Sequence, residues 1–417
     1  MHFRNGENMS EDIGLRSLEL HRKNRGKVGT SVRVNCNDKD GLSLAYTPGV
    51  AAVCKEIEKN ADTAYDLTMK WNTVAIVSDG TRVLGLGNIG PLAAIPVIEG
   101  KAALFKAYAN IDAWPICLAC KTVDEIVATV KNIAPVFGGI NLEDIENPKC
   151  FEVENRLKRE LDIPVFHDDQ HGTAIVVLAG LTNALKVAGK TKFNSKVVIV
   201  GAGAAGTAIA KLLVEDGFSN ILVCDKNGIL VNSADLPEHK EELARLTNKE
   251  WKSGSILDAL EGADVLIGAS SPNIIDASDV KRMAAKPIIF VLSNPIPEID
   301  PALAIKNGAF VVGTARSDMP NQVNNVLGFP GVFRGALMVR AKKVTERMKI
   351  SAAYALSNVL SDEELTPGRI LPDAFDRRVV PAIAIAVAHE AVLGGVARVN
   401  KTDDQLREEL RVLGLLD

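Results

Sequence analysis

Residues 166–174 read FHDDQHGTA and place two aspartates and two histidines within five consecutive positions. An apolar run ending at Phe166 precedes them and has the composition of a buried strand, and apolar residues at helical spacing follow. Carboxylates and imidazoles are side chains that bind metal ions and move protons. Because ligands gather at the carboxyl ends of parallel strands, Asp168 and Asp169 become candidate site residues if this strand belongs to a parallel sheet.

A second acidic pair, Glu143 and Asp144, ends the apolar stretch GGINLEDI. Carboxylates that converge without cysteine are typical of a Mg²⁺ or Mn²⁺ site that leaves room for substrate oxygens. Zinc held by His167 and His171 is the alternative. It is less favoured, because their spacing would need a helix where the sequence predicts a strand end and a turn.

A glycine-rich loop lies between a Val/Ile run and an apolar helical stretch, in the sequence KVVIVGAGAAG at residues 196–206. This strand–loop–helix context is the one that a dinucleotide-binding motif requires. Its first glycine permits a tight turn, its second a close approach to pyrophosphate, and its third close packing of helix on sheet. The predicted cofactor-binding residues of the loop are Gly201, Ala202, Gly203, Ala204, Ala205 and Gly206.

Asp225 ends the next predicted strand, 19 residues after Gly206 (225 − 206). An acid at this place binds the ribose 2′-hydroxyl of NAD. Lys226 follows immediately and would instead attract a 2′-phosphate, so the sequence leaves both NAD and NADP open.

The bulk composition restricts the class of protein. The chain has 417 residues, enough for two or three domains, with 47% hydrophobic residues and a formal charge of −4. This charge does not favour nucleic acid as a partner, and no segment reaches the roughly 18 apolar residues of a membrane span. The N-terminus lacks the apolar core of a signal peptide, and six scattered cysteines predict a reducing cytoplasm. The single C-x-x-C of Cys117 and Cys120 is interpreted as buried structural thiols.

The order of predicted elements indicates an α/β protein. We expect an N-terminal α/β domain over residues 1–170, a doubly wound Rossmann domain with a parallel sheet over 171–330, and C-terminal helices over 331–417 that pack back on both. Helices are predicted near the N-terminus, from about Pro96 to 109, at 124–132 and 173–187, and after Pro330 at 335–347, 351–359 and 380–392.

The chain resembles the malic enzymes in their short microbial form, over nearly its whole length. The resemblance rests on eight stretches in the expected order: YTPGVA, SDGTRVLGLGNIG, EGKAALFK, INLEDI, FHDDQHGTA, GAGAAG, LSNP and NNVLGFPG. It implies oxidative decarboxylation of L-malate to pyruvate and CO₂ with reduction of NAD or NADP, dependent on Mg²⁺ or Mn²⁺. Decarboxylation of oxaloacetate is implied as well.

The resemblance also implies roles for individual residues. Glu143, Asp144 and Asp169 would hold the cation. Lys101 would be the general base and contact substrate, Tyr46 the general acid, and Asp168 a hydrogen-bonding partner near Lys101. The implied substrate and cofactor contacts are Arg82 for a substrate carboxylate, Asn294 for cofactor and substrate, and Asn325 for substrate. His167 and His171 have no implied role and are interpreted as packing or hydrogen-bonding groups.

One electrostatic question stays open at this level. A free lysine has a pKa of about 10.4, so Lys101 must have a lowered pKa to act as a base. Burial and a nearby cation lower the pKa, whereas Asp168 raises it. The sequence does not decide which effect is larger.

Three other functions remain as alternatives: a malolactic enzyme that converts malate directly to lactate, a metal-independent amino-acid dehydrogenase, and a nucleotide-binding regulator without catalysis. The resemblance implies a homodimer or larger homo-oligomer. The polar segment before Tyr46 is too short to form a domain and is predicted to pack on a neighbouring subunit, where Tyr46 would complete the neighbour's site.

Overall fold

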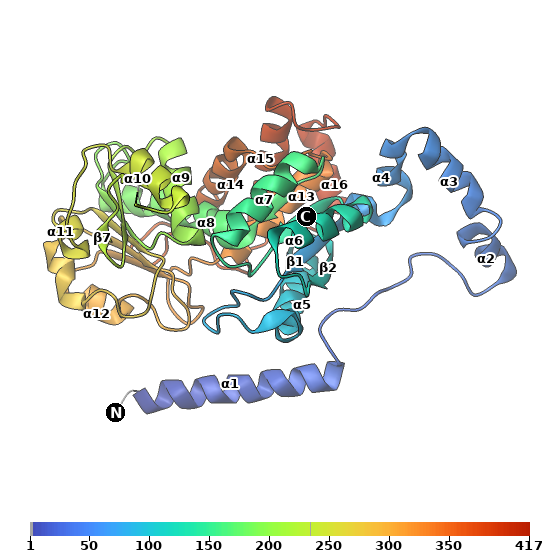
Figure 1. The fold of residues 1–417 in the computed structure, drawn as a ribbon. Helices are drawn as coiled ribbons and strands as arrows, with labels where there is room; N and C mark the ends of the chain where they lie inside the picture. Colours follow the sequence, from blue (N-terminus) through green and yellow to red (C-terminus); the bar gives the residue numbers. More distant parts are fainter. Residues whose placement is uncertain (1–2, 234) are drawn as a thin grey trace.

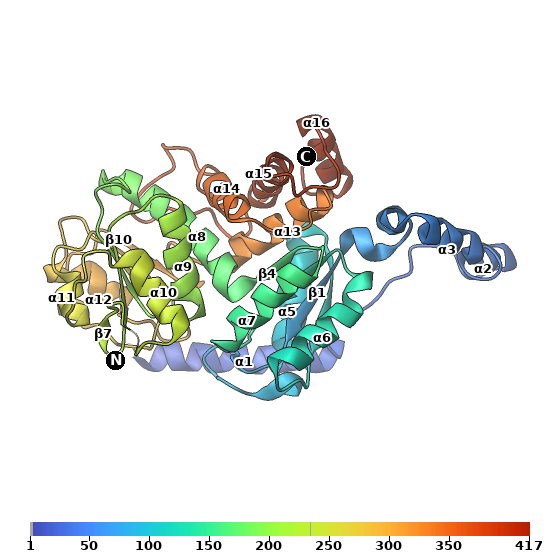
Figure 2. The ribbon, with the colours of Figure 1, turned by 45° about the horizontal axis from the view of Figure 1, so that its top comes forward.

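The computed structural model describes the backbone of residues 3–233 and 235–417, and the side chains from Asp12 onward. Figure 1 shows two α/β lobes side by side, with the C-terminal helices lying over both and an N-terminal arm that extends away from them. The same arrangement appears in Figure 2, where the top of the molecule has come forward. The predicted α/β class with C-terminal helices is confirmed.

The N-terminal lobe is built on a four-stranded parallel sheet in the order β2-β1-β3-β4. Its strands are β1 (Thr73–Ser78), β2 (Asp112–Cys117), β3 (Gly139–Leu142) and β4 (Val165–His167). Its helices are α5 (Gly90–Ala109), α6 (Val123–Ile133) and α7 (Lys149–Glu160). Every residue of β1 and β3 is buried, as expected for strands covered on both faces.

Two details of this lobe differ from the sequence-based expectation. Helix α5 begins at Gly90 and not near Pro96, because Pro91 occupies the start of the helix, where proline is tolerated. Cys117 and Cys120 are half-buried and not buried, since Cys117 lies on β2, an edge strand of the sheet.

The second lobe contains a six-stranded sheet in the order β10-β9-β8-β5-β6-β7. The strands are β5 (Val197–Val200), β6 (Ile221–Asp225), β7 (Gly228–Ile229), β8 (Val265–Gly268), β9 (Ile288–Val291) and β10 (Val311–Thr314). Only β7 runs antiparallel to its neighbour. The helices between them are α9 (Ala204–Glu215), α10 (Glu238–Thr247), α11 (Ile256–Leu260) and α12 (Pro301–Lys306). The chain reverses direction across the sheet between β5 and β8, so the predicted doubly wound architecture is confirmed.

Helix α8 (Asp168–Ala188) connects the two lobes and packs against α9 and against α14 (Glu346–Ser357). It starts directly after β4, so the predicted turn at 168–172 is wrong. Two acids in its first turn stabilise the helix N-terminus, and Gly172 does not interrupt it. The helix is long and apolar enough to cross a membrane, but 72% of its apolar window is buried inside the protein, as in a core helix.

The C-terminal segment holds α13 (Phe329–Met338), α14, α15 (Val379–Leu393) and α16 (Asp403–Val412). Helix α13 is entirely buried and packs on α5 and α15, whereas α14 packs on α8. The predicted helix at 335–347 is therefore misplaced, because the chain turns after Met338. Helix α16 was not predicted, since its composition is mostly polar, although Thr402 and Gln405 form a capping box at its start.

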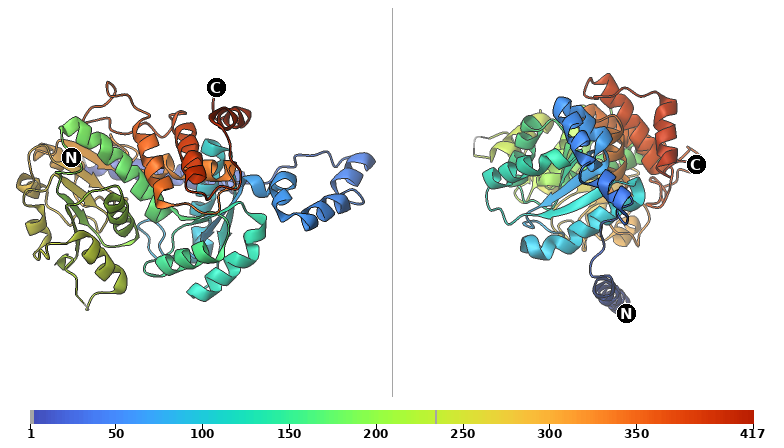
Figure 3. Two further views of the ribbon diagram at one scale, coloured as in Figure 1. Left: turned by 90° about the horizontal axis from the view of Figure 1, so that it is seen from above. Right: turned by 90° about the vertical axis from the view of Figure 1, so that its right-hand side faces the viewer.

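The N-terminal arm consists of α1 (Phe3–Asn24), α2 (Lys39–Ala45), α3 (Val50–Lys59) and α4 (Ala64–Leu67). Figure 3 shows α1 separated from the lobes and α2–α3 projecting beyond the N-terminal lobe. The arm exposes large apolar side chains, among them Ile13, Leu15, Leu18, Leu20, Leu42 and Leu44. Exposed apolar side chains of this kind are typical of surfaces that bind another protein. Packing of the arm on a neighbouring subunit stays a prediction.

A buried arginine fastens the C-terminal helices to the N-terminal lobe. Arg334 on α13 has no exposed surface, and its Nε donates a hydrogen bond to the carbonyl oxygen of Ala109 at 3.0 Å. One of its terminal nitrogens donates to Asn72 Oδ1 at 2.5 Å and to the carbonyl oxygen of Asn110 at 3.3 Å. Burial lowers the pKa of Arg334 to about 10. These bonds fix α13 against the turn between α5 and β2.

Replacing this arginine tests how much the fastening contributes. We expect Arg334→Ala to lower the apparent free energy of unfolding by about 3 kcal/mol, because it leaves Asn72 Oδ1 and the carbonyl oxygen of Ala109 without this donor and creates a cavity. Urea unfolding followed by circular dichroism measures the change. Arg369→Ala is the control, since exposed Arg369 pairs only with Glu364 and should change stability by less than about 1 kcal/mol. Equal effects of the two substitutions would contradict the role given to Arg334.

Candidate active site and metal centre

A cavity of about 1160 Å³ lies between the two lobes and is lined by residues of both. It brings together most of the residues predicted from the sequence. From the N-terminal lobe and α8 these are Arg82, Lys101, Glu143, Asp144 and Asp169, and from the second lobe and the segment after it Gly203, Ala204, Ala205, Asn294 and Asn325. Tyr46 and Asp225 do not line this cavity.

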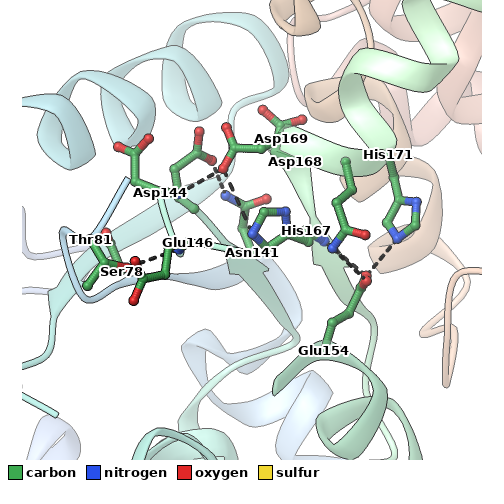
Figure 4. Close-up of polar contacts among 12 residues, drawn as sticks. Ser78, Thr81, Asn141, Asp144, Glu146, Glu154, His167, Asp168, Asp169 and His171 are labelled. Carbon is green, nitrogen blue, oxygen red and sulfur yellow. Dashed lines mark hydrogen bonds and ion pairs between the residues drawn. The ribbon is translucent and has the colours of Figure 1, made fainter. Parts of the chain in front are cut away.

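Three acids meet at the carboxyl edge of the first sheet. Glu143 and Asp144 follow β3, and Asp169 lies in the first turn of α8. One carboxylate oxygen from each lies within 4.8 Å of the others, so the three can share one cation. Asp169 Oδ2 also accepts a hydrogen bond from the backbone N–H of Asp144 at 2.8 Å (Figure 4). Asp144 adopts φ of 56°, a left-handed conformation that aspartate tolerates better than most residues.

The electrostatics of these acids fit a divalent cation. Asp144 Oδ2 is buried without a hydrogen-bond partner in the described part of the chain. Burial, followed by the charges of Asp169 and Glu143, raises the pKa of Asp144 to about 9. Burial likewise raises the pKa of Glu143. A cluster of oxygen ligands that repel one another when ionised, two of them buried, is suited to Mg²⁺ or Mn²⁺, which would supply the missing positive charge.

Lys101 lies next to the acids, on α5, and is buried. Its Nζ is 2.5 Å from Asp168 Oδ2 and 3.0 Å from Glu143 Oε1. Asn325 Nδ2 donates to the same Asp168 oxygen at 2.5 Å. Burial alone would lower the pKa of Lys101, but the charges of Asp168 and Glu143 outweigh it and raise the pKa above its ordinary value. In the absence of a cation, the acidic partners therefore outweigh burial.

Gly172 and Asn141 support this cluster and were not singled out in the sequence. A Cβ at position 172 would lie 1.8 Å from Asp168 Oδ1, so only glycine leaves room for that carboxylate. Asn141 Nδ2 donates to Glu143 Oε2 at 2.8 Å. The only available signals were the glycine in DDQHG and the asparagine two residues before Glu143, which points to the same face of the strand.

Glu154 on α7 contacts the ring of His171 and the backbone of His167. The His167 ring instead faces the acids, with its Nε2 3.8 Å from Asp169 Oδ2. Glu154 Oε1 accepts hydrogen bonds from His171 Nε2 at 2.8 Å and from the backbone N–H of His167 at 3.2 Å (Figure 4). Burial lowers the pKa of His171 to about 4, so this ring is neutral at physiological pH. His171 is a hydrogen-bonding group, as interpreted from the sequence. The acidic cluster includes no histidine, which does not favour the zinc alternative.

The glycine-rich loop has the geometry that a dinucleotide requires. Gly201 has φ of 122°, and a Cβ on Gly206 would lie 1.9 Å from the carbonyl oxygen of Gly201. Gly203 precedes α9, whose N-terminus opens toward the cavity with Ala204 and Ala205. Backbone N–H groups at a helix N-terminus are suited to bind pyrophosphate.

Asp225 ends β6, as predicted, and its carboxylate is already engaged. Asp225 Oδ2 pairs with Lys240 Nζ at 2.6 Å, and Oδ1 accepts the backbone N–H of Asn227 at 2.8 Å. The structure thus places a carboxylate and an ammonium group together where the adenosine ribose of a dinucleotide binds in this fold. An acid suits the ribose diol of NAD and a cation suits the 2′-phosphate of NADP, so both remain open.

Comparison with known proteins identifies the family. The description "Malic enzyme, N-terminal domain" matches residues 24–158, and "Malic enzyme, NAD binding domain" matches residues 170–392. The chain belongs to the malic enzyme family. A bifunctional malic/malolactic enzyme from Bacillus subtilis is 52% identical and covers 96% of this chain and 98% of its own. An NAD-dependent malic enzyme from Geobacillus stearothermophilus is 53% identical and covers 89% of this chain and 78% of its own.

Solved structures agree with this assignment. A malic enzyme from Pyrococcus horikoshii has a TM-score of 0.92 at 46% identity and covers 96% of this chain and 95% of its own. An NAD-dependent malic enzyme from Thermotoga maritima has a TM-score of 0.86 at 51% identity, covering 89% and 98%. Membership of the malic enzyme family favours the first function inferred from the sequence over the amino-acid dehydrogenase and the regulator.

The raised pKa of Asp144 gives a prediction for the melting temperature. Without a cation, the folded chain keeps a proton on Asp144 up to a pKa of about 9, whereas the ordinary value is 3.8. The folded state therefore binds more protons than the unfolded state between these values, and stability falls as the pH rises through this window. A cation bound by the folded state opposes this loss, so Mn²⁺ should raise the melting temperature more at about pH 8.5 than at about pH 6.

Differential scanning fluorimetry in EDTA and in excess Mn²⁺ measures both increments. Asp144→Asn is the matched variant, because it keeps the shape of the side chain and removes the ionisable group. Its Mn²⁺ increment should be small at both pH values. An increment in the unmodified chain that is equal at both pH values, or larger at low pH, would contradict the assignment of Asp144.

Proposed function

We propose that this chain catalyses the metal-dependent oxidative decarboxylation of L-malate to pyruvate and CO₂, with reduction of NAD or NADP. The observation that carries the proposal is the Lys101 amine, 2.5 Å from Asp168 and 3.0 Å from Glu143, in a cavity shared by three acids and a dinucleotide loop. A base, a cation site and a hydride acceptor are the groups that this reaction needs within one site.

The cation would be Mg²⁺ or Mn²⁺ held by Glu143, Asp144 and Asp169, and it would acidify the C2 hydroxyl of malate and stabilise the negative charge left when CO₂ departs. Arg82 lines the cavity and forms no ion pair with a carboxylate in the described part of the chain, so it is available to bind a substrate carboxylate. Asn294 and Asn325 line the same cavity and would contact cofactor and substrate.

Lys101 would receive the proton of the C2 hydroxyl as hydride leaves C2. This requires a neutral amine, although its acidic partners hold a proton on Lys101. Asp168 is the nearest acceptor for that proton, and burial raises the pKa of Asp168 to about 7. Glu143 would stabilise the ammonium group less once it ligates a cation, which would lower the pKa of Lys101. Tyr46 would protonate C3 after decarboxylation.

A malolactic reaction is the second candidate, because the Bacillus subtilis relative is named a bifunctional malic/malolactic enzyme. In that reaction the reduced cofactor stays bound and reduces pyruvate to lactate. Decarboxylation of added oxaloacetate would use the same acids and is proposed as a side activity.

The six cysteines are all unpaired, which supports a cytoplasmic location.

Initial rates with L-malate test the proposal. The chain is treated with EDTA and assayed at 340 nm with NAD or NADP, with and without added Mn²⁺. We expect reduced cofactor to accumulate only with Mn²⁺ and malate. Lactate formation without accumulation of NADH would favour the malolactic reaction, and metal-independent turnover would contradict the proposed site.

Lys101→Ala tests the base. We expect kcat to fall by about 10²-fold or more, as losses of a general base do. Lys106→Ala is the matched control on the same helix, because exposed Lys106 pairs with Asp112 outside the cavity. Near-normal turnover of Lys101→Ala, measured at saturating malate and Mn²⁺, would refute the assigned role.

We further propose that Tyr46 acts in the site of a neighbouring subunit of a homodimer or larger homo-oligomer. Tyr46 is 67% exposed at the end of α2, on the arm that projects from the N-terminal lobe (Figure 3). It does not line the cavity that contains Lys101. An arm with exposed apolar residues is suited to carry the tyrosine to a second copy of the chain.

Mixing two inactive variants tests this arrangement. Tyr46→Phe and Lys101→Ala subunits are unfolded together and refolded, and activity is compared with each variant refolded alone. In a mixed dimer one site combines an intact Tyr46 with an intact Lys101, so random pairing should restore about a quarter of full activity. No recovery despite mixed dimers in native mass spectrometry would place Tyr46 in the site of its own subunit.

A further inference from the structure

A buried acid outside the catalytic cluster connects two loops of the second lobe. Glu298 follows β9 and has no exposed surface. Its Oε1 accepts the backbone N–H of Ser270 at 2.8 Å, and its Oε2 accepts the backbone N–H of Ser293 at 3.1 Å. Ser270 belongs to the loop after β8 and Ser293 to the loop after β9. One carboxylate thus holds the ends of two adjacent strands.

Both loops form a wall of the large cavity. Ala269–Pro272 of the first loop and Leu292–Ile296 of the second line it together with the glycine-rich loop. A doubly wound sheet consists of two halves that meet where the strand order reverses. One half of the sheet binds the adenosine part of a dinucleotide and the other binds the nicotinamide part. Asp225 belongs to the half formed by β5 and β6. The loops held by Glu298 belong to the other half, where the nicotinamide would lie beside Lys101.

The position of this carboxylate is fixed sterically. A Cβ on Gly268, the last residue of β8, would lie 2.8 Å from Glu298 Cδ and 2.9 Å from its Cγ. The absence of a side chain at Gly268 therefore leaves the space that Glu298 fills. The carbonyl oxygen of Glu298 accepts the N–H of Ile275 at 3.2 Å, which attaches the segment to the far end of the β8 loop.

The contacts of Glu298 are hydrogen bonds to the backbone. It forms no ion pair within the described residues. Burial raises the pKa of Glu298, and the N–H groups of Ser270 and Ser293 oppose that rise. A buried carboxylate is costly unless it is hydrogen-bonded, and two partly buried N–H groups would lose their acceptor if it were removed. The N–H groups of the two loops thus stabilise the Glu298 carboxylate, and the carboxylate in turn fixes the loops.

We propose that Glu298 is a positioning residue that fixes the β8 and β9 loops around the nicotinamide half of the cofactor. This inference rests on the proposed use of NAD or NADP by the chain. It assigns to Glu298 a part in cofactor binding that is separate from the adenosine contacts of Asp225.

Cofactor binding by variants of the full chain tests the inference. NADH is titrated by its fluorescence, without malate or metal, and AMP binding is measured by calorimetry as a probe of the adenosine half alone. Glu298→Ala should raise the Kd for NADH by about 10-fold, because the backbone donors of Ser270 and Ser293 lose their acceptor and both loops are released. It should leave the Kd for AMP within about twofold. Glu298→Gln keeps one acceptor oxygen and the same shape, so its effect on NADH should be smaller.

Glu261→Ala is the matched control, since exposed Glu261 pairs with Arg282 on the surface of the same lobe and should leave both Kd values unchanged. Melting temperatures are recorded for all variants. A purely structural role would lower the melting temperature while leaving the ratio of NADH to AMP affinity unchanged, and this result would overturn the inference. Equal weakening of NADH and AMP would overturn it as well.

A double-variant cycle tests the contact itself. Gly268→Ala alone should weaken NADH binding, because its Cβ displaces the Glu298 carboxylate. In the Glu298→Ala background the same change should have almost no further effect, since the displaced atoms are gone. If the two substitutions weaken NADH binding additively, the contact between position 268 and the Glu298 side chain is contradicted. An unmodified chain that binds NADH but does not oxidise malate would contradict the proposed function only. The role of Glu298 would still be decided by the NADH and AMP titrations.

Discussion

The mutual repulsion of buried carboxylates is the constraint on which the rest of the site depends. Glu143, Asp144, Asp168 and Asp169 come together at one edge of a parallel sheet. Their only nearby cation within the described residues is the Lys101 ammonium group. One positive charge does not balance four carboxylates. Burial, followed by the charges of neighbouring acids, raises the pKa of Asp144, and burial raises the pKa of Asp168. The charges of Asp168 and Glu143 outweigh burial and raise the pKa of Lys101.

The fold concentrates these charges by joining two elements without a spacer. Strand β4 ends at His167 and α8 begins at Asp168, so the first turn of the helix lies directly at the carboxyl edge of the sheet. The positive end of the helix dipole favours acids there, and Glu154 accepts the N–H of His167 just before it. The second lobe then contributes the dinucleotide loop at the opposite wall of the same cavity. Sheet edges of two lobes therefore provide the two halves of one site.

The sequence was informative where chemistry is encoded locally. The GAGAAG loop and the acids of LEDI and HDDQH have fixed spacings and defined neighbours, and the structure places residues of both in one cavity. Glu154 and Glu298 were missed, because each is a single acid in an ordinary stretch and becomes buried only through tertiary packing. The start of α8 and the direction of the Lys101 pKa shift could not be predicted from local sequence patterns either, since both depend on atoms that are distant in sequence.

Helix α8 starts at the acids and continues for 21 residues through the interior shared by both lobes. Its axis is therefore a fixed reference between the two halves of the molecule. Because the first residue of α8 follows β4 directly, Asp168 and Asp169 belong to the same sheet edge as Glu143, and Lys101 on α5 pairs with acids of that edge. The base and its acidic partners therefore share one rigid frame, and the second lobe supplies the wall of the cavity that faces them.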